Sequence, residues 1–257
     1  MLSGRGRRAE RRRLAFAAGI VLAAVMGYEV WRLISTPTAE HSVKVALMAT
    51  GVDTPFPRDD SNAMKLLQNY LDKVQNVASQ GAQVIVLPEK IALVSDQATS
   101  DVDSLFASGA AAGANVLVGL DRGTVTSRFN EARLYSAVGG LTAIYDKHHM
   151  VPVLEDVDRP GTAISVVGQP SGVWGIQICK DMDFPGLSRQ YGAKGVGLLL
   201  VPAWDFTLDG WLHGRMAVMR GVESGFTIAR AAKQGLLTVS DDRGAFCIPA
   251  RSGTGPS

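Results

Sequence analysis

The chain has 257 residues, of which 46% are hydrophobic and 19% are charged, and its formal net charge is +2. This length and composition are those of an ordinary globular protein with one sizeable core. Six arginines in the first 13 residues carry the positive charge, so the remainder is slightly acidic and a nucleic-acid-binding face is not expected.

The N-terminal segment has the pattern of a membrane anchor. A basic tail at residues 1–13 precedes an apolar stretch at 14–34, which has roughly the 20 residues that a helix needs to cross a bilayer. Arginines before the stretch predict a cytoplasmic tail, so we expect a single-pass protein of the cell membrane with an extracytoplasmic catalytic domain. A cleaved signal peptide is the alternative, but residues 35–39, in the linker at 35–42, make a poor cleavage site.

Beyond the linker, short apolar runs alternate with helical patterns. Apolar residues recur at helical spacing over 62–79, after the potential capping residues Asp59 and Asp60. Two adjacent glycines predict the tight turn of a hairpin between strands at 132–138 and 141–145. The other expected elements are strands at 43–48, 84–87, 116–120, 173–178, 196–201, 226–229 and 237–240, and helices at 103–114, 184–191 and 211–224. This alternation indicates an α/β domain at 43–250, followed by a disordered tail at 251–257.

Three chemically reactive residues follow expected strands. Glu89 follows VIVLP, Lys147 follows LTAIYD and Cys179 follows VWGIQI. Ligands of open α/β sheets bind where the carboxyl ends of strands meet. A thiol attacks only as the thiolate, so a carboxylate that takes its proton and an ammonium that stabilises the resulting oxyanion complete a nucleophilic site. The backbone N–H of Lys180 is a natural second oxyanion donor.

Each of these residues also has a simpler interpretation. A cysteine that ends a strand is often a small buried hydrophobe, and a lone Glu or Lys after a strand is usually solvated. A disulfide between Cys179 and Cys247 is not expected, because two cysteines are a weak disulfide framework. The sequence contains no zinc-ligand spacing, and the adjacent pair His148 and His149 is expected to be exposed on a loop. No metal or cofactor is implied.

The order Glu, Lys, Cys, in the contexts VIVLPEK, YDKHHMVPVLE and IQICKDMDFPGLSR, resembles the nitrilase superfamily of carbon-nitrogen hydrolases. The YDKHHMVP segment, with the following Glu155, is similar to the branch that contains apolipoprotein N-acyltransferase. The resemblance implies an αββα four-layer sandwich after the N-terminal transmembrane helix. It also implies Glu89 as general base, Lys147 as stabiliser of the tetrahedral intermediate and Cys179 as the acylated nucleophile.

Supporting roles follow from the same resemblance. Glu155 would orient the lysine, although an exposed loop acid is an equal alternative. Trp204 either lines the pocket or packs in the core or on the surface. Asp181 keeps the acid that the family carries after its cysteine, whereas Lys180 replaces an aromatic residue.

The chain also departs from the acyltransferase branch. It has one apolar span where that branch has several membrane helices, and the last strands of the family are largely missing, which leaves open a C-terminally truncated domain.

The sequence therefore predicts a membrane-anchored enzyme that forms a thioester at its cysteine. The enzyme either hydrolyses an amide or transfers an acyl group to an amine, as in lipoprotein biosynthesis. Its expected partners are an amide or acyl-donor substrate, such as a phospholipid with a lipoprotein amine, the lipid bilayer and a second copy of the chain. A degenerate nitrilase-like binding module is the alternative.

Overall fold

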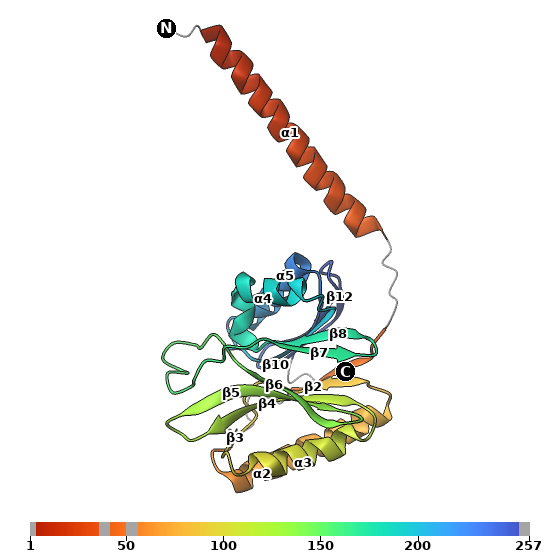
Figure 1. Cartoon of the computed structure of the whole chain (residues 1–257), viewed down its shortest axis with the longest axis vertical. Helices are drawn as coiled ribbons and strands as arrows, with labels where there is room; N and C mark the ends of the chain where they lie inside the picture. The colour runs from red at the N-terminus through yellow and green to blue at the C-terminus, as the bar shows by residue number, and fades with distance from the viewer. Residues whose placement is uncertain (1–3, 36–41, 50–55, 252–257) are drawn as a thin grey trace. The chain divides into compact units, whose positions relative to one another are not determined.

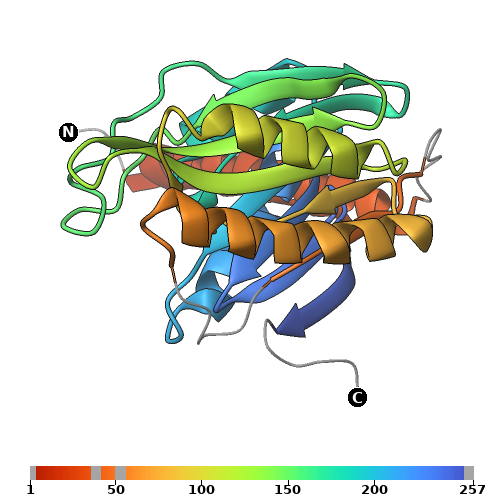
Figure 2. The same cartoon turned by 90° about the horizontal axis from the view of Figure 1, so that it is seen from below.

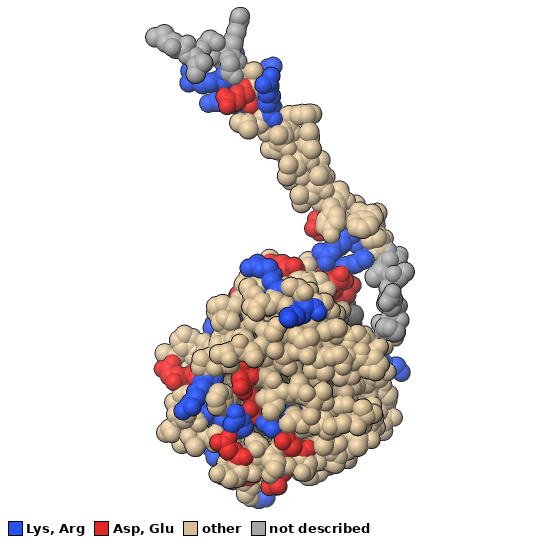
Figure 3. All heavy atoms as spheres, in the orientation of Figure 1, with Lys and Arg blue, Asp and Glu red and all other residues tan. Residues whose placement is uncertain are grey.

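The computed structural model describes residues 4–35, 42–49 and 56–251, with the backbone alone at 4–6 and 246–251. The chain divides into two units, Met1–Glu40 and His41–Ser257. The described residues of the first unit form the helix α1 (Gly4–Ile34), whose part Arg7–Ile34 is long and apolar enough to cross a membrane. Basic side chains gather at the N-terminal end of this helix, and its middle is uncharged (Figure 3). The basic segment is thus helical from Gly4 onward.

The second unit contains two six-stranded sheets. In the first sheet the order is β1-β2-β4-β5-β6, and β3 pairs with β4. Strands β1, β2 and β4 are parallel, whereas β4, β5 and β6 form an antiparallel meander, so β6 runs in the same direction as β2. The strands of this sheet are β1 (Val45–Leu47), β2 (Val84–Val86), β3 (Leu93–Val94), β4 (Asn115–Gly123), β5 (Arg128–Ser136) and β6 (Gly140–Asp146).

The second sheet has the order β12-β11-β10-β9-β8-β7. Its centre, formed by β8, β9 and β10, is parallel, and antiparallel strands complete both sides. The strands are β7 (Ser165–Gln169), β8 (Gly172–Ile176), β9 (Leu198–Trp204), β10 (Thr227–Lys233), β11 (Leu236–Ser240) and β12 (Phe246–Arg251).

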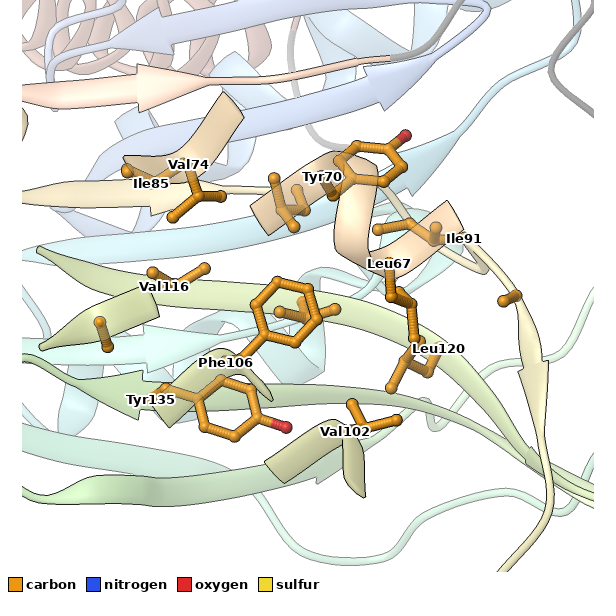
Figure 4. Packing of buried hydrophobic residues seen from close by; sticks show 14 of the residues in the cluster. Leu67, Tyr70, Val74, Ile85, Ile91, Val102, Phe106, Val116, Leu120 and Tyr135 are labelled. Carbon is orange, nitrogen blue, oxygen red and sulfur yellow. The ribbon is translucent and has the colours of Figure 1, made fainter. Parts of the chain in front are cut away.

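Helices cover the outer face of each sheet, and the two inner faces pack together (Figure 1). On the first sheet, α2 and α3 lie side by side (Figure 2). Buried residues of both helices meet the sheet, among them Leu67, Val74 and Phe106, whose ring stacks on Tyr135 at 5.7 Å between centroids (Figure 4). The helices are α2 (Asp60–Ser79), α3 (Thr99–Ala110), α4 (Pro185–Ala193), α5 (Gly210–Ser224) and the 3₁₀ helix η1 (Cys179–Asp183). The α/β class is confirmed, and the layers follow the order α, β, β, α.

Apolar periodicity and capping residues predicted most of the helices. Asp59 caps α2 by accepting the backbone N–H of Asn62 at 2.9 Å, as its sequence pattern predicts. The expected helix at 103–114 was displaced: α3 begins at Thr99 and ends before Gly113, whose φ of +106° is incompatible with a helix. Strands β3, β7 and β12 were not predicted. β3 has only two residues, and in β7, SVVGQ, two adjacent valines are the whole apolar signal. The expected tail after residue 251 and the side chain of Cys247 lie outside the described residues.

Gly119, in the middle of β4, allows the backbone after β2 to pass closely. A Cβ atom at this position would overlap the carbonyl oxygen of Pro88 and lie 2.8 Å from the Cα of Glu89. We predict that Gly119→Ala lowers the free energy of unfolding by about 1–3 kcal/mol, because the backbone must move to admit the methyl group. Chemical denaturation would measure this loss. Gly168→Ala is the matched control, since its Cβ would meet no atom within 4 Å, and an equal effect of both substitutions would contradict the prediction.

Candidate active site

The three sequence-predicted residues come together around one cavity of about 550 Å³. Glu89 follows β2 and Lys147 follows β6, so both leave the same end of the first sheet. Cys179 follows β8 of the second sheet and is the first residue of η1. The cavity therefore lies where the strand ends of both sheets converge.

Lys147 is the most deeply buried of the three and is held by two carboxylates. Its Nζ lies 2.8 Å from Oε1 of Glu89 and 2.9 and 3.1 Å from the two carboxylate oxygens of Glu155. Asn130, on β5, donates its side-chain N–H to both acids, at 2.6 Å to Glu89 and 2.8 Å to Glu155. Glu155 is only 5% exposed, so its interpretation as an exposed loop acid is wrong.

The two carboxylates keep the lysine charged. Burial alone would lower the pKa of Lys147, but the negative charges of Glu89, Cys179 in its ionised form and Glu155 raise it above its usual value. Burial alone would likewise raise the pKa of Glu155, whereas Lys147 and Lys90 lower it to about 2. The site thus holds a permanent ammonium next to ionised Glu155.

Cys179 is held as a thiol in the resting site. Its Sγ lies 3.5 Å from the carbonyl oxygen of Trp204, to which the S–H donates. Burial first, and the charge of Glu89 second, raise the pKa of the thiol, while Lys147 opposes them. The backbone of Cys179 has a φ of +42°, a strained conformation for a residue with a Cβ. The chain therefore turns sharply at Cys179, where η1 begins after β8.

Asp181, which is fully buried, connects the loop of Lys147 to the turn of Cys179. Its carboxylate accepts the backbone N–H of Ile178 at 3.3 Å, those of His148 and His149 at 3.2 and 2.9 Å, and the Tyr145 hydroxyl at 2.7 Å. His149 also contacts Asp181 through Nδ1 at 2.9 Å. The expectation of exposed histidines was therefore wrong: both are half-buried. Asp181 does not itself line the cavity.

A second group of buried charges surrounds Lys90, the residue after Glu89. Its Nζ lies 2.8 Å from Glu155, 2.5 Å from Asp158 and 3.5 Å from Asp121. Arg128 pairs with the same two aspartates, at 2.6 Å to Asp158 and 3.1 Å to Asp121. Burial raises the pKa of Asp121 to about 7. Because Glu155 pairs with both Lys90 and Lys147, it links this group of charges to Lys147.

A third group lies on the wall formed by the second sheet. Asp205 is fully buried and pairs with both terminal nitrogens of Arg230, which is also buried. Nδ1 of His213, on α5, lies 3.3 Å from the same carboxylate. His213 and Trp204 line the cavity, and the ammonium of Lys233 lies 4.0 Å from the centre of the Trp204 ring. Trp204 thus faces the cavity rather than filling the core.

The remaining sequence-predicted residue, Lys180, also lines the cavity, with its side chain 30% exposed. Sequence reasoning missed Asn130, Lys90 and Arg128. Asn130 and Arg128 lie at the start of β5, before the hairpin strand that was expected at 132–138, so no predicted element included them. Within the described ranges, no group of three or more His, Cys, Asp or Glu side chains is arranged to hold a metal ion.

This fold and site belong to a known class. The sequence profile of the carbon-nitrogen hydrolase family matches residues 45–244, so the chain belongs to that family.

Among curated proteins, the chain is similar to deaminated glutathione amidase from Yersinia enterocolitica, with 32% identity over 113 residues that cover 40% of each protein. It is also similar to apolipoprotein N-acyltransferase from Allorhizobium ampelinum, with 28% identity over 88% of this chain and 49% of the relative. The chain spans about half or less of the length of the curated relatives it matches.

Solved structures share the fold. Nit3 from Saccharomyces cerevisiae, a member of branch 10 of the nitrilase superfamily, matches with a TM-score of 0.72 and 19% identity over 86% of this chain and 90% of that chain. A mutant of the amidase from Nesterenkonia sp. AN1 matches with a TM-score of 0.70 and 23% identity over the same shares. That structure shows covalent addition of the acetamide moiety of fluoroacetamide at the active-site cysteine.

Glu155 lies between two buried lysines and compensates the charge of both. Glu155→Gln leaves Lys147 and Lys90 undercompensated, so the free energy of unfolding at pH 7 should fall by about 3–5 kcal/mol. The pKa of Glu155 is lowered on folding, so its contribution is present above pH 4.5 and is lost as the pH falls toward 2.

Urea denaturation of both proteins at pH 7 and pH 3.5 would measure this difference, which should be smaller at pH 3.5. The control is Glu223→Gln, which removes a carboxylate that is 40% exposed and paired with Arg220. A pH-independent difference would contradict the assignment.

Proposed function

We propose that this chain is a thiol-dependent carbon-nitrogen hydrolase in which Glu89, Lys147 and Cys179 act together on an amide. One observation carries the proposal: a buried thiol shares a cavity with a carboxylate whose partner is a buried ammonium. Such an arrangement costs desolvation energy for each charge, and it gains little for stability alone. Membership of the carbon-nitrogen hydrolase family supports the same reaction class.

The first half-reaction forms a thioester. Glu89 takes the proton of Cys179 as Sγ attacks the carbonyl carbon, and the carbonyl oxygen becomes an oxyanion. Lys147 and the backbone N–H of Lys180, at the start of η1, stabilise that charge. When the intermediate collapses, the C–N bond breaks, and the amine leaves with the proton that Glu89 returns.

The second half-reaction hydrolyses the thioester. Glu89 takes a proton from water, the hydroxide attacks the carbonyl carbon, and the thiolate leaves and recovers the proton. The products are a carboxylic acid and ammonia or an amine. Glu155 keeps Lys147 charged and in place throughout, and Asp181 maintains the separation of the lysine and cysteine loops.

Acyl transfer to an amine is a second candidate, supported by apolar side chains around the cavity. Leu154 and Phe206 line it and are 57% and 49% exposed, and Leu208 nearby in sequence is 99% exposed. Exposed apolar side chains at a cavity suit a lipid acyl donor, because each buried CH₂ contributes about 0.8 kcal/mol. In that reaction an amine, instead of water, would attack the thioester.

Intact-mass spectrometry of the full chain would distinguish the two reactions. After incubation with a panel of small amides, we expect ammonia release that falls on the order of a thousandfold or more in Cys179→Ala. A Cys179-dependent gain of a fatty-acyl mass after incubation with phospholipid would instead establish the transferase half-reaction. The control is Cys247→Ala, which removes the other thiol. Activity that survives in Cys179→Ala would refute the mechanism, and inactivity of the unsubstituted protein in both assays would favour the binding module.

We also propose that α1 anchors the protein in the cell membrane, with the basic N-terminus in the cytoplasm and the hydrolase domain outside. The uncharged middle of the helix and the arginines before it support this orientation. After alkaline carbonate extraction, the full chain should remain in the membrane pellet, and protease added to spheroplasts should digest the domain. Release of a domain that lacks α1 would instead identify a cleaved signal sequence.

A further inference from the structure

The buried and the more exposed parts of the cavity lining differ in charge. Its most buried members include Lys147, Glu89, Glu155 and Cys179, which are 1%, 2%, 5% and 8% exposed, and the ammonium and carboxylates there compensate one another. The more exposed members include three basic side chains from distant parts of the chain: Arg58 before α2, Lys180 on η1 and His213 on α5. We call these three residues the basic rim.

The charges of the basic rim are only partly compensated. Within the described part of the chain, Arg58 is exposed and makes no ion pair. The partner of Lys180 is Asp183 at 3.4 Å, and because both side chains are about a quarter exposed, this surface pair contributes little.

His213 faces three acids, yet only one of them lines the cavity. Asp205 is already paired with Arg230, and Asp183 acts only from a distance. Asp209, the single carboxylate among the more exposed lining residues that the structure describes, lies 3.8 Å from Nε2 of His213. The hydrogen bond to Asp205 raises the pKa of His213, which favours its cationic form. Among the described, more exposed residues of the lining there are therefore three basic groups and one carboxylate.

Gln234 adds an uncharged donor to the same lining. Its backbone has a φ of +60°, a conformation that a glutamine adopts only under strain. Its side-chain amide makes no hydrogen bond to any described residue. Strained residues with unused polar groups cluster at ligand sites, and an amide N–H is a good partner for an anion. The aromatic rings of Phe56, Trp204 and Phe206 line the remaining wall.

We propose that the basic rim is a subsite for an anionic group of the substrate, either a carboxylate or a phosphate. The scissile carbonyl lies at Cys179, a short hydrocarbon spacer lies against the aromatic wall, and the anion is bound by Lys180, His213 and Arg58. The inference rests on the proposed function for the position of the carbonyl. It adds that the preferred substrate carries a negative charge at its far end.

Binding to the full-length Cys179→Ala variant in detergent tests this subsite without requiring turnover. Calorimetry would compare glutaramate with glutaramide, which differ only in a carboxylate against a carboxamide. We expect glutaramate to bind about tenfold more tightly at low salt, an advantage that decreases as salt increases. A second comparison, of dihexanoyl phosphatidylglycerol with dihexanoylglycerol, tests phosphate. A preference in the first pair alone identifies a free carboxylate, and a preference in the second alone identifies a lipid headgroup.

Substitutions in the same background assign the preference to residues. Lys180→Gln changes a partly exposed side chain and Arg58→Gln an exposed one. Each should weaken the anionic ligand about threefold or more while leaving the neutral ligand unchanged. The matched control is Lys194→Gln, an exposed lysine at the end of α4 that does not line the cavity.

Equal affinities within both ligand pairs, or equal losses for charged and neutral ligands, would overturn the subsite. Failure of the proposed function would instead appear as an absence of turnover in the unsubstituted protein, while this anion preference persisted.

Discussion

The burial of the Lys147 ammonium is the constraint on which the rest of the site depends. A cation that is 1% exposed is stable only if carboxylates replace the water that it loses. Glu89 and Glu155 supply these, and Asn130 holds both acids in position from the neighbouring strand β5. The first sheet therefore has to place β2, β5 and β6 in one register, since a shift of one residue would turn Asn130 to the other face.

The same logic extends outward from Glu155. Because this carboxylate is shared by Lys147 and Lys90, the charge of Lys90 needs further acids, which are Asp158 and Asp121, and these in turn pair with Arg128. Each acid or base in this series compensates the charge of its neighbour, and together these side chains form a network with limited freedom to rearrange. Its contribution to stability is modest, because desolvation offsets most of the attraction, but it defines the geometry around Glu89.

The second sheet contributes the thiol, and Asp181 sets its relation to the first sheet. This carboxylate bonds the backbone on both sides, at Ile178 before the cysteine and at His148 and His149 after the lysine. Two sheets that pack mainly through apolar side chains could slide, because hydrophobic contact has no direction. Directional hydrogen bonds at their shared edge remove that freedom. The strained turn at Cys179 is maintained by these bonds and by the packing of η1.

The sequence by itself indicated the α/β class, most helices and strands, and the three reactive residues, because each depends on local features: apolar periodicity, capping by Asp59, and the end of an apolar run. It did not reveal that Glu155 is buried, that Asn130 joins two acids, or that His149 contacts Asp181. Lys147 and Glu89 are 58 positions apart and Asn130 and Glu89 are 41 apart, so their meeting depends on how strands pair in space. Tertiary structure alone decided which charges compensate one another, because that depends on distance and burial, and neither is encoded locally.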